Sequence, residues 1–252
     1  METPRWRSYA ELAWTEPIIT PPEDYVEETD LLAELIKGHS KIAVKKLLHL
    51  GCGAGGNDYA FKRHFDVTGV DIAEGMLEVA KQVNSEVVYH LGDMRTVELG
   101  ESFDAVTIPD SIGHMTTVED LRAAINTSRK HLNPGGVLLI TANVADDFSA
   151  NNFAYTGSSG DIEITVFENN YIPDPAGTTY EATFVYLIRN KGELEIATDH
   201  GNIGLFKLEI WLELFKEEGL EVEEIKLEHG YDRFIMGEGE YPQHIFVCIK
   251  PF

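Results

Sequence analysis

Short apolar runs recur along the first part of the chain, and the first two of them end at a glycine and at an aspartate. They lie at residues 47–50, 67–70, 87–90, 103–108 and 137–140, and segments of helical composition separate them at 74–82 and 117–132. Runs of this length without polar alternation are typical of buried parallel strands. Strands that alternate with helices predict right-handed crossovers, so we expect an α/β fold with a doubly wound, mostly parallel sheet.

The pattern changes on both sides of this core, which spans residues 46–142. Residues 1–24 are rich in proline and aromatic residues and precede a helical pattern at 23–37, which predicts an N-terminal arm and helix over 1–40. Alternating segments at 162–168, 180–190 and 193–206 predict an antiparallel insertion over 150–206 that covers the substrate side. A last helix and two strands over 207–252 complete a seven-stranded sheet within one domain.

The composition narrows the classes of partner. The formal net charge of the 252 residues is −23, which opposes binding to nucleic-acid phosphates and to anionic membranes. No apolar run approaches the roughly 20 residues of a membrane-spanning helix, and the polar first residues lack the apolar part of a secretory signal. Only Cys52 and Cys248 are present, so we expect no disulfide framework. These features predict a cytoplasmic protein with neither a nucleic-acid nor a membrane partner.

A glycine-rich loop, Gly-Cys-Gly-Ala-Gly-Gly at residues 51–56, follows the first strand and precedes a helix. Glycine permits a tight turn and a close backbone approach to a ligand, and a helix N-terminus favours a carboxylate or a phosphate. Asp71 ends the second strand, where its carboxylate can accept hydrogen bonds from both ribose hydroxyls of an adenosine. NAD and S-adenosylmethionine both contain adenosine, so these residues alone leave both cofactors open.

Two later segments separate these cofactors. Gly92-Asp93-Met94 follows the third strand, where an aspartate can accept a hydrogen bond from the adenine amine, and Asn133-Pro134-Gly135-Gly136 precedes the fifth strand. At this point the chain resembles the class I S-adenosylmethionine-dependent methyltransferases. The segments that carry the resemblance lie in family order over roughly 46–140, at 47–56, 70–72 with Met76, 92–94, 103–106 and 132–136.

The resemblance implies a Rossmann-like fold, S-adenosylmethionine as the cofactor and S-adenosylhomocysteine as its product. The methionine part would lie beside Gly51 and Gly53, while Asp71 would hold the ribose. Asp93 would bind the adenine amine, and Ile72, Met76 and Met94 would enclose the adenine ring. The residues expected to bind the cofactor are Tyr25, Gly51, Cys52, Gly53, Asp71, Ile72, Met76, Gly92, Asp93, Met94 and Pro109.

Methyl transfer requires the protein mainly to position the acceptor atom against the methyl group. Transfer from a sulfonium is an in-line displacement in a dry site, and an amine acceptor needs only to arrive neutral. His114, just after the fourth strand, is the best acid–base candidate, and packing of its loop is the alternative role. We expect no metal. The residues expected to line the acceptor site are Trp14, His114, Tyr155 and His200.

Residues 24–27 and 110–115 resemble the small-molecule N-methyltransferases, especially those that act on nucleotide-linked amino sugars and on glycine. This resemblance implies a small-molecule acceptor, an amine nitrogen as the methylated atom, and closure of Tyr25 over the cofactor. The low basic content argues against an acceptor with a diphosphate without excluding one. An NAD(P)-dependent oxidoreductase and a methyltransferase-fold binding protein without turnover stay open as alternatives. A homodimer stays open as the oligomeric state.

Overall fold

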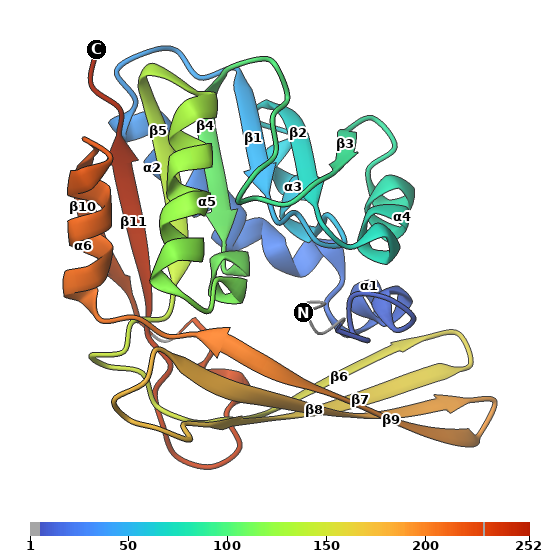
Figure 1. Cartoon of the computed structure of the whole chain (residues 1–252). Coiled ribbons are helices and arrows are strands. Elements are labelled where there is room, and N and C mark those ends of the chain that lie inside the picture. The colour runs from blue at the N-terminus through green and yellow to red at the C-terminus, as the bar shows by residue number, and fades with distance from the viewer. Residues whose placement is uncertain (1–5, 229) are drawn as a thin grey trace.

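A seven-stranded sheet forms the centre of the molecule (Figure 1), in the order β10-β11-β5-β4-β1-β2-β3. The computed structural model describes residues 6–228 and 230–252. The strands of this sheet are β1 (Lys46–Leu50), β2 (Asp66–Asp71), β3 (Val88–Leu91), β4 (Phe103–Pro109), β5 (Leu132–Ala142), β10 (Glu221–Leu227) and β11 (Gln243–Ile249). All neighbours are parallel except the two pairs that involve β11. The predicted mostly parallel α/β sheet is therefore confirmed.

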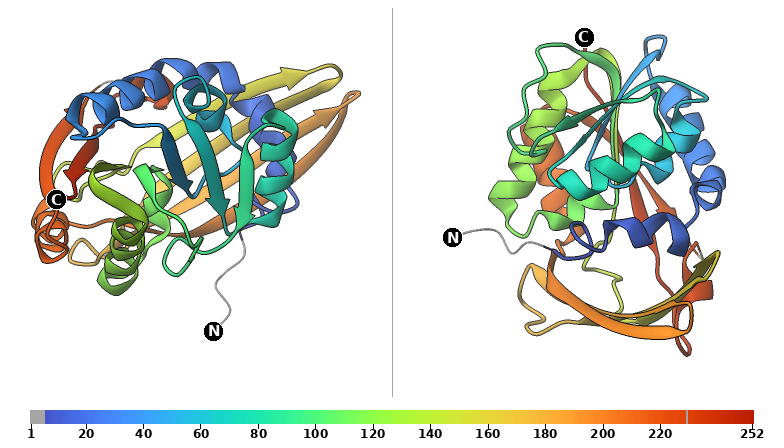
Figure 2. Two further views of the ribbon diagram at one scale, coloured as in Figure 1. Left: turned by 90° about the horizontal axis from the view of Figure 1, so that it is seen from above. Right: turned by 90° about the vertical axis from the view of Figure 1, so that its right-hand side faces the viewer.

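Helices cover both faces of this sheet (Figure 2). On one face, α2 (Val26–His39) and α3 (Gly56–Phe61) bury apolar residues such as Ile36 and Phe61 against the strands. On the other face, α5 (Val118–His131) and α6 (Leu208–Glu217) do so with Leu121 and Trp211. A shorter helix, α4 (Glu74–Val83), packs near β2 and β3. Within the described residues, no helix is both long enough and apolar enough to cross a membrane.

Helix ends follow the signals in the sequence. The Thr117 hydroxyl accepts a hydrogen bond from the Asp120 backbone N–H at 3.1 Å, which caps the N-terminus of α5. That helix ends at His131, and Asn-Pro-Gly-Gly at residues 133–136 lies at the start of β5. Gly219 adopts a φ of +66° just after α6, where a left-handed glycine satisfies the last carbonyls.

A second sheet of four antiparallel strands lies across the carboxyl ends of the parallel strands (Figure 1). Its strands run in chain order as β6 (Asn152–Ser159), β7 (Ile162–Tyr171), β8 (Thr179–Asn190) and β9 (Glu193–Gly204). The sequence predicted the last three and missed β6. Its residues, NFAYTGSS, are mostly small or polar and have weak strand propensity. Pairing with β7 along its whole length gives β6 the hydrogen bonds that its side chains do not signal.

The N-terminal arm fills the space between the two sheets (Figure 2). It consists of the short helices η1 (Ala13–Thr15), α1 (Glu16–Ile19) and η2 (Pro22–Tyr25). Leu12 and Ile18 pack on the antiparallel sheet, while Ala13 packs on Ala54 and Met76 of the parallel-sheet layer. The arm therefore connects the glycine loop to the sheet that covers it.

Candidate cofactor and acceptor site

The glycine loop lies at the point where the order of the sheet reverses. β1 has β4 on one side and β2 on the other, and the chain leaves β1 directly into residues 51–56. In open α/β sheets, ligands bind outside the carboxyl ends of the strands at such a switch point. Gly51, Gly53 and Gly55 have φ angles of +70°, +54° and +78°, which glycine adopts without strain.

The amides of the first two loop glycines are used inside the fold. The Gly51 N–H donates to the Val70 carbonyl at 2.7 Å, and the Gly53 N–H donates to Asp71 Oδ2 at 2.8 Å. The helix that follows, α3, has only six residues. Both amides therefore have partners inside the fold, and the short helix has only a weak dipole to attract an anion.

Gly53 nevertheless leaves room for a ligand. A Cβ at Gly53 would meet nothing within 4 Å, whereas one at Gly51 would lie 2.2 Å from the Ser111 Oγ. The loop therefore packs tightly against Ser111 at Gly51 and faces open space at Gly53. An open backbone surface beside a carboxylate is what close approach of a cofactor requires.

Asp71 lies beside this space with apolar residues around it. Its Oδ1 accepts a hydrogen bond from the Ala73 N–H at 2.8 Å, and burial raises the pKa of its carboxyl. Ile72 is 64% exposed at the end of β2, while Met76 and Met94 are buried. An exposed apolar side chain next to an acidic one suits an adenosine, whose ring is apolar and whose ribose donates hydrogen bonds. The residues present therefore fit S-adenosylmethionine.

The remaining residues predicted for the cofactor lie around the same edge. Arg95 donates to both carboxylate oxygens of Asp93, and these hydrogen bonds lower the pKa of Asp93. Arg95 also pairs with Asp120 at 2.8 Å, so Asp93 is held in one orientation. Cys52 and Pro109 are buried at the ends of β1 and β4, and burial raises the pKa of the Cys52 thiol.

A network of buried polar side chains contacts the glycine loop, and the sequence patterns did not predict it. His49 Nδ1 lies 2.7 Å from Asp58 Oδ1, and the Tyr89 hydroxyl donates to Asp58 Oδ2 at 2.9 Å. Asn84 donates to the Gly55 carbonyl at 2.8 Å. His49 interrupts the apolar run of β1, and a polar residue in a buried strand is the signal that could have indicated such a network.

On the acceptor side, His114 lies on η3 (Ser111–His114) within an aromatic group. Its Nε2 is 3.1 Å from the Tyr9 hydroxyl, and its ring makes edge contacts with Trp6 and Tyr9. Burial lowers the pKa of His114 to about 4. His114 is therefore neutral at pH 7 and a weak base there.

Two further predicted residues lie on the same side. The Tyr25 hydroxyl donates to Glu16 at 2.9 Å, and its ring covers Gly56, where an added Cβ would be 2.5 Å away. The Tyr155 hydroxyl donates to Glu168 at 2.9 Å. These contacts place Tyr25 over the glycine loop and Tyr155 on the inner face of the antiparallel sheet.

The other two predicted acceptor residues, Trp14 and His200, are exposed. Trp14 lies on η1 with 41% of its surface exposed. His200 is exposed on β9, and its side chain alternates with those of Ala197 and Asp199, which are buried against the arm side. Because successive side chains point to opposite faces of a strand, His200 faces away from the parallel sheet. The assignment of His200 to the acceptor site is therefore corrected.

Asp110 is a site residue that the sequence reasoning missed. It follows β4 with φ +59° and ψ −39°, an unfavourable conformation for a non-glycine residue. Its side chain is accessible to solvent, yet desolvation, followed by the negative charges of Glu28 and Glu168, raises its pKa to about 6. Asp110 is thus an exposed residue whose carboxyl is desolvated by the surrounding protein. An aspartate directly after a strand at the switch point was the signal that could have found it, as for Asp71.

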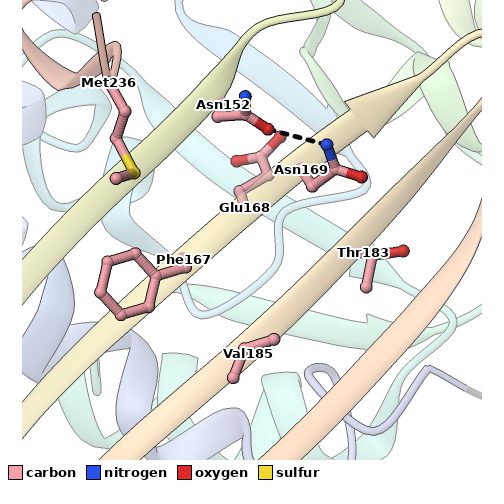
Figure 3. A pocket seen from close by; sticks show the side chains of 7 residues that line it. All are labelled: Asn152, Phe167, Glu168, Asn169, Thr183, Val185 and Met236. Atoms are coloured by element: carbon pink, nitrogen blue, oxygen red, sulfur yellow. Dashed lines mark hydrogen bonds between the residues drawn. The ribbon is translucent and has the colours of Figure 1, made fainter.

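A hollow of about 400 Å³ lies elsewhere, on the antiparallel sheet (Figure 3). Phe167 and Val185, which line it, alternate with Val166 and Tyr186 of the inner face, so the hollow opens on the outer face. The sheet separates it from the glycine loop, and it is not the cofactor site. Within the described residues, no three histidine, cysteine or acidic side chains are grouped to hold a metal ion.

Comparisons with known proteins agree with this geometry. Residues 47–136 match the family model described as a methyltransferase domain. The dTDP-3-amino-3,4,6-trideoxy-alpha-D-glucopyranose N,N-dimethyltransferase of Streptomyces venezuelae is 35% identical over 120 residues, which are 47% of this chain and 50% of that protein. The chain spans about half the length of the curated relatives it matches first.

Two solved structures resemble the chain over most of its length. The crystal structure of Streptomyces venezuelae DesVI has a TM-score of 0.77 and 26% identity, and covers 91% of this chain and 92% of that one. The sugar N-methyltransferase KedS8 from Streptoalloteichus has a TM-score of 0.77 and 20% identity, and covers 96% and 92%. The second likeness is one of fold.

Residues 47–136 therefore match a methyltransferase domain, and the whole chain has the fold of a solved S-adenosylmethionine-dependent methyltransferase. These findings agree with the predicted family and with the predicted cofactor, S-adenosylmethionine. The methyltransferase interpretation is supported over the NAD(P)-dependent oxidoreductase.

Proposed function

We propose that this protein transfers a methyl group from S-adenosylmethionine to an amine nitrogen of a small molecule. One observation carries the proposal: the likeness to DesVI covers 91% of the chain, far more than the matched residues 47–136. It therefore extends beyond the cofactor domain into the antiparallel sheet on the acceptor side. The curated relatives named as amino-sugar N,N-dimethyltransferases support a nitrogen acceptor.

The chain's own residues would bind and orient the reactants. The open backbone at Gly53 admits the cofactor, Asp71 accepts hydrogen bonds from its ribose, and Ile72 covers one side of the adenine. Asp93, which Arg95 holds, would accept a hydrogen bond from the adenine amine. When bound, S-adenosylmethionine supplies an electrophilic methyl group on its sulfonium. Tyr25 and the arm would exclude water from the site.

His114 would act on the acceptor through position rather than as a strong base. With a pKa of about 4 its imidazole is neutral at pH 7, so it offers one acceptor and one donor nitrogen. Its contact with Tyr9 at 3.1 Å fixes the ring toward the arm. Tyr155 is proposed to line the opposite side of the acceptor space.

The cofactor proposal is tested by thermal unfolding with S-adenosylmethionine, S-adenosylhomocysteine, NAD and NADP. A ligand at about 100 times its dissociation constant stabilises the folded state by about 2.7 kcal/mol, which raises the midpoint of a chain of this size by about 5 to 10 °C. We expect this rise with the first two ligands only. A rise with NAD alone would contradict the proposal.

Gly53→Ala and Gly100→Ala form a matched pair for this test. Both residues have positive φ, +54° and +72°, and a Cβ at either would meet nothing within 4 Å. Both variants should lose a similar amount of stability, about 1 to 2 kcal/mol. Only Gly53→Ala should also lose the rise with S-adenosylmethionine, because only its methyl group enters the cofactor space. Equal responses of the two variants would remove Gly53 from the site.

Methyl transfer itself is measured by formation of S-adenosylhomocysteine and by the mass of the methylated amine. We expect turnover with a small primary or secondary amine. Binding of S-adenosylmethionine without turnover on any amine, alcohol or thiol would instead support the binding-protein alternative.

A further inference from the structure

Three carboxylates from distant parts of the chain converge at the acceptor side. Glu28 lies on α2, Asp110 follows β4, and Glu168 lies on β7. Tyr231 and Tyr155, which donate to Glu28 and Glu168, belong to one group of contacting rings with Phe153 and Tyr241. Desolvation, followed by the charges of Glu28 and Glu168, raises the pKa of Asp110. Gathering like charges in a poorly hydrated region opposes folding, so this acidic cluster, Glu28, Asp110 and Glu168, calls for an explanation outside stability.

The hydrogen-bond partners of the acidic cluster are neutral. The Tyr231 hydroxyl donates to Glu28 at 2.7 Å and the Tyr155 hydroxyl donates to Glu168 at 2.9 Å. Gln243 donates its amide nitrogen to Asp110 at 3.3 Å. Burial, followed by nearby negative charges that include Asp110, raises the pKa of six tyrosines, which are Tyr9, Tyr25, Tyr155, Tyr180, Tyr231 and Tyr241.

Two buried acceptor atoms beside the cluster have no donor. Gln243 is 3% exposed, and its Oε1 has no hydrogen-bond partner although its amide nitrogen reaches Asp110. Asn143 is 9% exposed, and its Oδ1 also lacks a donor, while its amide nitrogen donates to the Tyr241 hydroxyl. Gln243 begins β11 and Asn143 follows β5, so both lie at the same edge as Asp110. A buried acceptor without a donor costs stability, and a ligand that carries N–H groups would satisfy both.

We infer that the acceptor is a small cationic amine without a phosphate group, held by Asp110, Glu28 and Glu168 and by the free amide oxygens of Gln243 and Asn143. This inference rests on the proposed methyltransferase function and narrows its substrate. An ammonium has three N–H donors and a positive charge, which matches both the carboxylates and the unpaired acceptors. A phosphate at this position would meet three negative groups. The site therefore differs from one suited to the dTDP-linked amino sugars that the relatives' names describe.

The acidic cluster also provides a base, Asp110, for the proton that an ammonium must lose before it can be methylated. Asp110 takes one proton from the bound R–NH₃⁺, and the freed lone pair forms the new N–C bond. The S–C bond breaks with its electron pair staying on sulfur, which becomes neutral, and the product leaves as R–NH₂CH₃⁺. The proton on Asp110 passes to solvent, which reaches its side chain.

Arg233 provides the control for the alternative in which the acceptor carries a phosphate. Arg233 is exposed, with its guanidinium 4.6 Å from the ring centre of Phe234, and that ring lies 5.2 Å from Tyr155. If the acceptor carried a phosphate, Arg233 would be placed to bind it. Glu163 is the second control, because it lies on β7 with Glu168 but points to the outer face.

The experiment measures thermal unfolding of the full chain with S-adenosylhomocysteine present, at constant ionic strength set by sodium chloride. Ethanolamine and 1,4-diaminobutane are the ammonium probes, and phosphoethanolamine and inorganic pyrophosphate are the phosphate probes. We expect only the ammonium probes to raise the midpoint. Asp110→Asn and Glu168→Gln should weaken their binding by about 10- to 100-fold. Glu163→Gln and Arg233→Ala should leave it unchanged.

Each other outcome has a defined meaning. A rise with pyrophosphate that Arg233→Ala abolishes, or no rise with either ammonium probe, overturns the inference. Turnover of a dTDP-linked amino sugar without any response to free ammonium ions overturns it while leaving the proposed methyltransferase intact. A response to ammonium ions that the two cluster variants lose, in a protein that methylates no amine, supports the cation site and overturns the proposed function.

Discussion

Asp110→Asn is expected to slow methyl transfer by about 100-fold, within the range that loss of a proton acceptor causes. The asparagine keeps an oxygen to accept from Gln243, so the local hydrogen bond survives. It removes the negative charge that would bind the ammonium and take its proton. The expected change is seen in initial rates of S-adenosylhomocysteine formation, with a lower kcat and a higher acceptor KM. The thermal response to S-adenosylmethionine should stay as in the wild type.

The same substitution is expected to stabilise the fold above pH 6. The pKa of Asp110 is about 6 in the folded chain and about 4 in an unfolded one, so the folded state holds the proton more tightly. Ionisation of Asp110 therefore destabilises the fold as pH rises from about 4 to 6, and the full penalty is present above pH 6. Since the side chain is accessible to solvent, we expect a gain of only about 1 kcal/mol for the variant, or about 2 to 4 °C at pH 8.

Asp104→Asn is the control, because it is expected to destabilise the fold where Asp110→Asn stabilises it. Burial opposes ionisation of Asp104, but hydrogen bonds from the Lys46 and Lys45 N–H groups and from Asn133 outweigh it and lower its pKa. Its carboxylate therefore stabilises the fold at neutral pH, and that contribution is lost as pH falls through the folded pKa. The variant should melt lower than the wild type at pH 8. If Asp110→Asn also melts lower there, Asp110 has a structural role.

The rate of methyl transfer by the wild type should fall as the pH decreases through an apparent pKa near 6. Protonation of Asp110 below that pH removes the proton acceptor. The charges of Glu28 and Glu168 act on Asp110, whose own charge acts on the nearby tyrosine hydroxyls, and protonation of the two glutamates acts in the same direction. Asp110→Asn should lose this limb of the pH–rate profile, whereas His114→Asn should keep it. A limb near 6 that persists without Asp110 would assign it to another group.

Gly51→Ala is expected to have the largest effect on the cofactor site. A Cβ there would lie 2.2 Å from the Ser111 Oγ and 2.9 Å from the Met94 Cε, and φ is +70°. The left-handed conformation costs an alanine about 1 to 2 kcal/mol, and overpacking adds about 1 to 3 kcal/mol. The midpoint of thermal unfolding should drop by about 10 °C. Displacement of Ser111 and Met94 should also abolish binding of S-adenosylmethionine, measured by calorimetry below the midpoint.

Gly100→Ala separates the conformational cost from the overpacking cost in the stability loss of Gly51→Ala. Gly100 has nearly the same φ, +72°, but open space around it. It should show the conformational cost alone and keep full cofactor affinity. If Gly51→Ala were no less stable than Gly100→Ala, the tight contact with Ser111 would not be part of the native loop.

Much of the cofactor side follows from local patterns. The apolar runs of β1, β4 and β5 identify buried parallel strands because each strand lies between two others and has helices on both faces. Asp71 and the glycine loop follow from the requirement for an acidic residue and a turn without side chains at fixed places after strands. The capped start of α5 at Thr117 is likewise a local feature of the sequence.

The acceptor side follows from contacts that no local pattern contains. β6 has little strand propensity and depends on its partner β7 for its conformation. His200 was predicted for the site because the alternation of β9 shows two faces without showing which of them meets the arm. The acidic cluster joins residues 28, 110 and 168, which only the stacking of the antiparallel sheet and the arm on the parallel strands brings together.

The sequence by itself thus determined the methyltransferase core, its cofactor loop and its class of cofactor. These features are encoded over short stretches, where backbone geometry and burial constrain each residue type. The tertiary structure alone decided which distant side chains gather with Asp110, among them Glu28, Glu168 and Gln243. Such a site is assembled from side chains far apart in the chain, and the pKa of Asp110 depends on the desolvation and the neighbouring charges that folding creates.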